Sequence, residues 1–121
     1  MSRAVCIVDD DASVRKSLGN LLRSAGFECL AFAAGEVFLA SGQSREAGCV
    51  LLDLKMPGMS GLEVQRELAR RGWRLPVIGM SAHWDEGAVQ AALANGAQSC
   101  LGKPFSEEVL LKVVEAALAA E

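Results

Sequence analysis

Short apolar runs alternate along the chain with longer stretches in which apolar residues recur at helical spacing. The short runs are bounded by polar or turn residues and predict strands at residues 4–8, 27–32, 49–52, 75–80 and 99–101. The helical spacing predicts helices over residues 14–25, 37–40, 60–71, 88–93 and 106–118. The pattern indicates five repeats of a strand followed by a helix.

Capping residues support several of these boundaries. Asp11 stands where the first helix should begin, and aspartate is a preferred N-cap. Ser60 and Glu63 have the spacing of a capping box, which predicts a helix start at that point. Three helices are predicted to end at a glycine, namely Gly26, Gly72 and Gly96.

Continuous apolar runs are typical of strands buried on both faces of a parallel sheet. Right-handed crossovers between such strands place helices over both faces. We therefore predict an α/β fold: a single flavodoxin-like (βα)5 doubly wound parallel sheet with strand order 2-1-3-4-5. A chain of 121 residues is expected to form one domain, over residues 1–121.

Composition narrows the class of protein. The formal net charge is −3, so the chain lacks the basic surface that would neutralise nucleic-acid phosphates. No apolar run approaches the roughly 20 residues that span a bilayer, and no signal-peptide pattern precedes the first strand. The four cysteines form no C-x-x-C pair and stand in apolar stretches, which predicts buried structural thiols. These features predict a cytoplasmic domain with no membrane association.

Polar residues follow four of the predicted strands at the point where each strand ends. They are Asp9, Asp10 and Asp11 after the first strand, Asp53 after the third, Ser81 and His83 after the fourth, and Lys103 after the fifth. Because parallel strands end at the same edge of the sheet, these side chains should converge there. Asp11 is the exception, since it is expected to cap the first helix.

Crowded carboxylates repel one another unless a cation neutralises them. Mg²⁺ prefers oxygen ligands and leaves positions open for phosphate oxygens. An ammonium group and a hydroxyl beside that ion would complement a phosphoryl group. Asp53 comes from a central strand and is therefore the candidate nucleophile or acceptor.

These residues lie in segments that resemble the receiver domains of two-component response regulators, and the resemblance covers essentially the whole chain. The matching segments are Val8-Asp9-Asp10-Asp11, LDLKMPGMSG at 52–61, Met80-Ser81-Ala82 and Gly102-Lys103-Pro104-Phe105. Residues 14–18 and 56–61 are most similar to receivers that precede a helix-turn-helix output domain of the nitrogen-fixation and quorum-sensing type.

The resemblance implies a phosphoryl acceptor with a Mg²⁺ cofactor. Asp53 would accept the phosphoryl group from a sensor histidine kinase. Asp10 would bind Mg²⁺ directly and Asp9 partly through water. Asp53 and the backbone carbonyl of Lys55 would complete the protein ligands.

Other roles follow from the same resemblance. Ser81 would hydrogen-bond the phosphoryl group, and Lys103 would pair with it across a cis Lys103–Pro104 peptide bond. Lys55 and His83 stand where phosphoryl lifetime is influenced in the family. The chain would thus be a phosphoacceptor that assists its own phosphorylation and dephosphorylation, rather than an enzyme acting on a separate substrate.

One position departs from the family pattern. Receivers usually carry a tyrosine or phenylalanine three residues before the lysine on the fifth strand, and here that residue is Cys100. An aromatic rotor cannot operate there. Trp84, just after the Ser81 loop, could take over part of that role or could simply pack on the loop or the fourth helix.

The expected output is a change in the surface formed by the fourth helix, the fifth strand and the fifth helix. That surface could support a homodimer, and DNA would be contacted only through an output domain outside this chain. The alternatives are a stand-alone receiver, a phosphorelay intermediate or a receiver-like module that only binds partners. An aspartyl phosphohydrolase would need a second acid where Lys55 stands, and three aspartates would repel the phosphate of a flavin.

Overall fold

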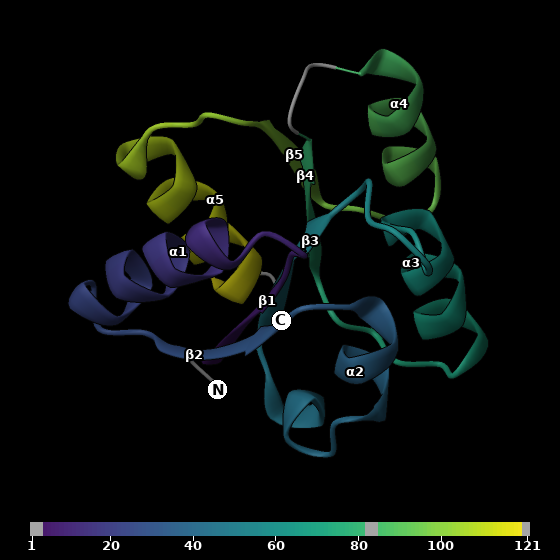
Figure 1. The fold of residues 1–121 in the computed structure, drawn as a ribbon, viewed down its shortest axis with the longest axis horizontal. Coiled ribbons are helices and arrows are strands. Elements are labelled where there is room, and N and C mark those ends of the chain that lie inside the picture. Colours follow the sequence, from purple (N-terminus) through teal and green to yellow (C-terminus); the bar gives the residue numbers. More distant parts are fainter. Residues whose placement is uncertain (1–3, 82–84, 120–121) are drawn as a thin grey trace.

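A five-stranded parallel sheet forms the centre of the molecule (Figure 1). The computed structural model describes residues 4–81 and 85–119. The strands are β1 (Ala4–Val8), β2 (Glu28–Phe32), β3 (Cys49–Asp53), β4 (Val77–Ser81) and β5 (Ser99–Gly102). Their spatial order is β2-β1-β3-β4-β5, which confirms the predicted strand order.

Helices cover both faces of this sheet. They are α1 (Ala12–Ser24), α2 (Gly35–Ala40), α3 (Gly61–Arg70), α4 (Glu86–Ala94) and α5 (Glu107–Ala119), with a short 3₁₀ helix η1 (Gln43–Glu46). In Figure 1, α1 and α5 lie on one side of the sheet, and α2, α3 and α4 lie on the other. The predicted doubly wound α/β architecture is confirmed.

The two layers have separate apolar cores because successive strand side chains point to opposite faces. Val5 and Ile7 of β1 pack under α1 and α5, whereas Cys6 and Val8 of the same strand pack under the other three helices. The strands β1, β3 and β4 are buried along their whole length. This burial explains their continuous apolar runs.

The edge strands differ from the prediction of strands buried on both faces. In β2 and β5 most residues are exposed or half-buried, because each strand has a neighbour on one side only. Cys29 and Cys100 lie on these strands and are half-buried, whereas Cys6 and Cys49 are buried. The expectation of four buried thiols was therefore wrong for the two edge cysteines, although all four are free.

The capping predictions are confirmed. The Asp11 side chain accepts hydrogen bonds from the backbone N–H groups of Ser13 and Val14 at the start of α1. Ser60 and Glu63 form a reciprocal capping box at the start of α3. The three predicted helix-ending glycines have positive φ angles, which a residue without a Cβ adopts at little cost.

Two features of the chain path were not predicted. The strand β4 begins at Val77 rather than Leu75, and Pro76 contributes only its carbonyl, which accepts from Val50 N at 3.0 Å. The helix η1 gave no periodic signal because it has only four residues. Ser44 holds it by donating a hydrogen bond to the Ser41 carbonyl at 2.8 Å.

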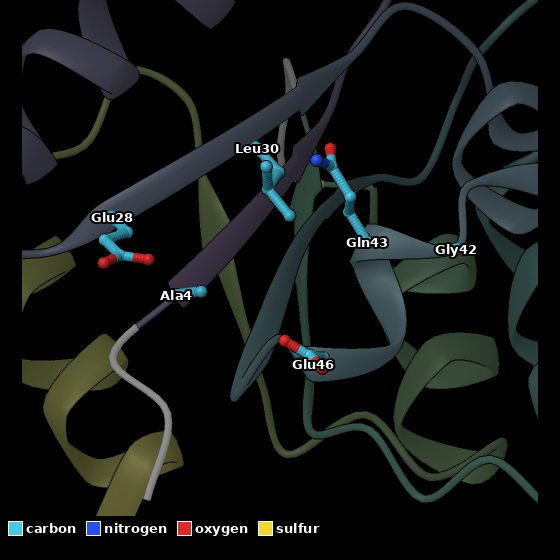
Figure 2. Close-up of a pocket in the computed structure, with 6 residues that line it drawn as sticks. All are labelled: Ala4, Glu28, Leu30, Gly42, Gln43 and Glu46. Carbon is cyan, nitrogen blue, oxygen red and sulfur yellow. The ribbon is translucent and has the colours of Figure 1, made fainter.

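A hollow of about 410 Å³ lies at the amino end of the sheet (Figure 2). Figure 2 shows Glu28 and Leu30 of β2 and Gln43 and Glu46 of η1 around it. Ala4 and Glu28 are the first residues of their strands. This hollow is therefore at the opposite end of the sheet from the carboxyl ends of the strands, where ligands bind in open α/β sheets.

Within the two described ranges, no helix is both long enough and apolar enough to cross a membrane.

Candidate functional site

Three carboxylates meet at the carboxyl end of the sheet. Asp9 directly follows β1, Asp10 is the next residue, and Asp53 is the last residue of β3. One carboxylate oxygen from each lies within 4.8 Å of the others. The central neighbours β1 and β3 end side by side, and this places the carboxylates together as predicted.

Lys103 inserts its ammonium group among these carboxylates. Its Nζ lies 2.6 Å from Asp9 Oδ2 and 3.7 Å from Asp53 Oδ2. The Asp9 side chain is 0% exposed and that of Lys103 is 17% exposed, so the pair is shielded from water. Lys103 follows β5 directly, and the Lys103–Pro104 peptide bond is cis, as the family resemblance implies. The lysine is bound mainly to Asp9 rather than to Asp53.

Asp9 is held at several points. Its Oδ1 accepts from the backbone N–H of Asp11 at 2.9 Å, while Oδ2 accepts from Lys103. Its backbone carbonyl accepts from Arg15 Nη1 at 2.7 Å. Because each oxygen of this buried carboxylate accepts a hydrogen bond, the Asp9 side chain is held in one position within the cluster.

Asp53 has a pKa raised from 3.8 to about 6. Burial is the largest cause because it disfavours the charged carboxylate, and the neighbouring charge of Asp9 acts in the same direction. Lys103 and the backbone N–H of Lys55 oppose the rise. Three carboxylates face one ammonium group here, so the site carries excess negative charge and favours a cation.

The loop between β3 and α3 holds Asp53 against the sheet. Leu54 N donates to the Met80 carbonyl at 2.9 Å, and Gly61 N donates to the Leu54 carbonyl at 3.3 Å. Lys55 N donates to Asp53 Oδ1 at 3.2 Å. These contacts connect the acceptor carboxylate to the start of α3.

Ser81 lies at the end of β4, opposite Gly102 of β5, and is 2% exposed. Its backbone carbonyl accepts from Lys103 N at 2.6 Å. The strand termini thus bring Ser81 and Lys103 to the same edge as the carboxylates, as the sequence predicts. His83 and Trp84 lie outside the described residues, so the roles considered for them stay predictions.

Cys100 pairs with Gly79 across β4 and β5. A Cβ added to Gly79 would lie 3.0 Å from Cys100 Sγ and 3.1 Å from Leu54 Cδ2. The thiol side chain therefore fills the space beside the glycine, and burial raises its pKa. It forms a packing contact where an aromatic side chain was expected from the resemblance.

One contact beside the site is not apparent from the sequence. Lys55 Nζ lies 2.6 Å from Asp85 Oδ2, and Asp85 caps α4 by accepting from Ala88 N at 3.0 Å. The cap could have been anticipated, since aspartate before a helical pattern is a typical N-cap. The ion pair could not have been anticipated from the sequence, because it depends on how the two loops approach each other in the folded protein.

Comparison with known proteins agrees with this geometry. Residues 5–115 match the response regulator receiver domain family. The chain belongs to that family. Receivers of this kind are phosphoacceptors in two-component systems, where they interact with histidine kinases, and they are generally not enzymes.

Relatives of this receiver include transcriptional regulators. It is 42% identical over 113 residues to Nodulation protein W of Bradyrhizobium diazoefficiens, a match that covers 93% of this chain and 50% of that protein. It is 38% identical over 117 residues to the transcriptional regulatory protein FixJ of Azorhizobium caulinodans, covering 97% of this chain and 56% of that protein. The chain thus spans about half the length of these relatives.

Solved structures support the same assignment. A crystal structure of FixJ-N superposes with a TM-score of 0.92 at 34% identity, over 100% of this chain and 97% of that one. The response regulator StyR gives a TM-score of 0.88 at 42% identity, over 97% of this chain and 59% of that one. Receiver domains bind Mg²⁺ at an acidic pocket, and the aspartate cluster of this receiver has the donor set that such a site needs.

Proposed function

We propose that Asp53 is the phosphoryl acceptor of this receiver and that Asp9, Asp10, Asp53 and the backbone carbonyl of Lys55 hold Mg²⁺. The approach of three carboxylate oxygens to within 4.8 Å of one another carries this proposal. Oxygen donors of this kind suit a hard divalent cation. The bound cation would neutralise charge on the carboxylates and on the transferred phosphoryl group.

The transfer is a displacement at phosphorus. A carboxylate oxygen of Asp53 forms a bond to the phosphorus of a phosphohistidine on the kinase, and the P–N bond breaks. The electron pair of that bond remains on the imidazole nitrogen of the kinase. The product on Asp53 is a mixed anhydride between a carboxylate and a phosphate.

Lys103 and Ser81 would stabilise this product. The Lys103 ammonium group is 3.7 Å from Asp53 Oδ2 and needs only a small displacement from Asp9 to reach a phosphoryl oxygen. Ser81 would donate a hydrogen bond to a second oxygen from the end of the neighbouring strand. Water would then attack the phosphorus, the P–O bond to Asp53 would break, and inorganic phosphate and the free Asp53 carboxylate would result. By stabilising the phosphoryl group, Lys103 and Ser81 would assist this dephosphorylation.

The phosphorylated receiver would act through the surface formed by α4, β5 and α5. Leu93 of α4 and Val109 of α5 are each 45% exposed, so both side chains would add apolar area to a homodimer or to a complex with another protein partner. The relatives FixJ and NtrC are named as transcriptional regulators. By analogy, residues 1–121 form a cytoplasmic receiver domain that controls a DNA-binding output domain; a stand-alone receiver or phosphorelay intermediate is the alternative.

Intact mass spectrometry tests the acceptor. Wild type incubated with acetyl phosphate and Mg²⁺ should gain the mass of one phosphoryl group, and chelation of Mg²⁺ beforehand should prevent the gain. Asp53→Asn should gain nothing. Asp11→Asn is the matched control, because it removes a neighbouring exposed carboxylate but keeps a good helix cap. An equal gain in Asp53→Asn would overturn the assignment of the acceptor.

A further inference from the structure

An ion pair joins the two loops that border the acceptor carboxylate. Lys55 lies two residues after Asp53, and Asp85 directly precedes α4. Their Nζ and Oδ2 atoms are 2.6 Å apart. The Lys55 side chain is 70% exposed and that of Asp85 is 33% exposed, so the pair forms on the surface. It connects the carboxyl ends of the adjacent strands β3 and β4.

Lys55 contacts the acceptor and Asp85 at the same time. Its backbone N–H donates to Asp53 Oδ1 at 3.2 Å, and its ammonium group binds Asp85. The ammonium group is a point charge on a flexible four-carbon stem, so it can turn toward another anion near its own backbone. A phosphoryl group on Asp53 would be such an anion and would carry up to about two negative charges.

Asp85 uses its two oxygens for different contacts. Oδ1 accepts from Ala88 N and caps α4, whereas Oδ2 accepts from Lys55. Breaking the second contact leaves the cap in place but removes this link between the first turn of α4 and the β3–α3 loop. The ion pair is therefore a direct contact between the loop that follows the acceptor strand and the start of α4.

We propose that Asp85 competes with the phosphoryl group on Asp53 for the ammonium group of Lys55. Phosphorylation would transfer the lysine from Asp85 to the phosphoryl group and release the start of α4. This inference rests on the proposed role of Asp53 as acceptor. Coupling is reciprocal, so the presence of Asp85 must weaken binding of the phosphoryl group by the factor with which that group weakens the ion pair. Asp85 is then a positioning residue that acts through Lys55.

Titration with beryllofluoride, a mimic of the phosphoryl group, tests the competition. The dissociation constant is measured at saturating Mg²⁺ and low ionic strength for wild type, Asp85→Asn, Lys55→Ala and the double variant. Asp85→Asn keeps a capping oxygen and removes the negative charge. This variant should bind beryllofluoride about threefold more tightly than wild type, a change of the size that an exposed ion pair contributes. The same substitution should have no effect in the Lys55→Ala background. The gain should also shrink in 1 M salt.

Glu86→Gln is the matched control, since it removes one negative charge from the adjacent residue in the first turn of α4. It should bind beryllofluoride as wild type does. An unchanged affinity in Asp85→Asn would overturn the competition, and so would an equal gain with and without Lys55. Failure of wild type itself to bind the mimic would instead reject Asp53 as acceptor, which separates the two ideas.

Discussion

Asp53 is a carboxylate in surroundings that penalise its charge. Its pKa of about 6 exceeds the ordinary value of 3.8, and the residue is 6% exposed. The folded protein therefore binds this proton more tightly than the unfolded chain does. Between about pH 4 and pH 6 the stability contributed by this group falls as pH rises, and above pH 6 the full penalty remains.

Asp53→Asn should therefore stabilise the protein at neutral pH in the absence of Mg²⁺. We expect an increase in the free energy of unfolding of about 2 kcal/mol at pH 7.5, because the neutral amide avoids the cost of the buried charge. The amide oxygen can still accept from Lys55 N. Urea denaturation from pH 4 to pH 8 measures the difference, which should disappear near pH 4. Equal stability at pH 7.5, or a difference independent of pH, would contradict the buried charge.

Sequence predicted which residues meet at the site but not how they pair. Asp9 and Lys103 directly follow β1 and β5, and Asp53 and Ser81 are the last residues of β3 and β4. Parallel geometry alone brings these strand ends to one edge. The preference of Lys103 for Asp9 depends on side-chain conformations in the folded core. The Lys55–Asp85 contact likewise depends on the spacing of two loops, for which no local pattern exists.

At the scale of elements, α3 approaches β3 more closely than a side chain would allow. A Cβ on Gly61 would lie 2.6 Å from the Asp53 carbonyl oxygen and 2.8 Å from Leu54 Cα. Both atoms belong to backbone, so they cannot move aside as a flexible side chain can. The first residue of α3 must be glycine if the acceptor is to keep its place.

Gly61→Ala should displace α3 from the acceptor strand. We expect a loss of about 2 kcal/mol in the free energy of unfolding, typical of forced overpacking, together with weaker Mg²⁺ binding. Urea denaturation and Mg²⁺ titration measure the two effects. Gly42→Ala is the matched control, because nothing lies within 4 Å of its added Cβ and its φ of −67° suits alanine. Similar values for the two variants would show that the close approach is not required.

Element boundaries were predictable where a local interaction sets them. The caps at Asp11 and Ser60 use hydrogen bonds within three residues, so sequence alone reveals them. The 3₁₀ helix η1 is different, since Ser44 also donates to Phe38 of α2 at 3.1 Å. The exposure of β2 and β5 depends on their positions at the two edges of the sheet. These positions follow from the predicted strand order, and they explain why Cys29 and Cys100 are only half-buried.

At the scale of the whole molecule, exposed apolar side chains distinguish two surfaces. Leu93 lies on α4 and Val37 on α2, at 45% and 55% exposure. Helices α2 and α4 cover the same face of the sheet, but α4 borders the edge strand β5 and α2 borders the opposite edge strand β2 (Figure 1). A dimer built on α4, β5 and α5 should therefore involve Leu93 and leave Val37 exposed.

Leu93→Glu should weaken dimerisation of the beryllofluoride-bound receiver by about tenfold or more, since a charge would replace buried apolar area in each partner. Sedimentation equilibrium over a range of concentrations, with and without Mg²⁺ and beryllofluoride, gives the dissociation constants. Val37→Glu introduces the same charge on a similarly exposed side chain and should leave dimerisation unchanged. Loss of the dimer in Val37→Glu but not in Leu93→Glu would place the interface on α2. If wild type stays monomeric under every condition, the receiver would act on a different protein instead of on a second copy of itself. The two variants therefore separate an effect of this surface from a general effect of added negative charge on a chain whose net charge is already −3.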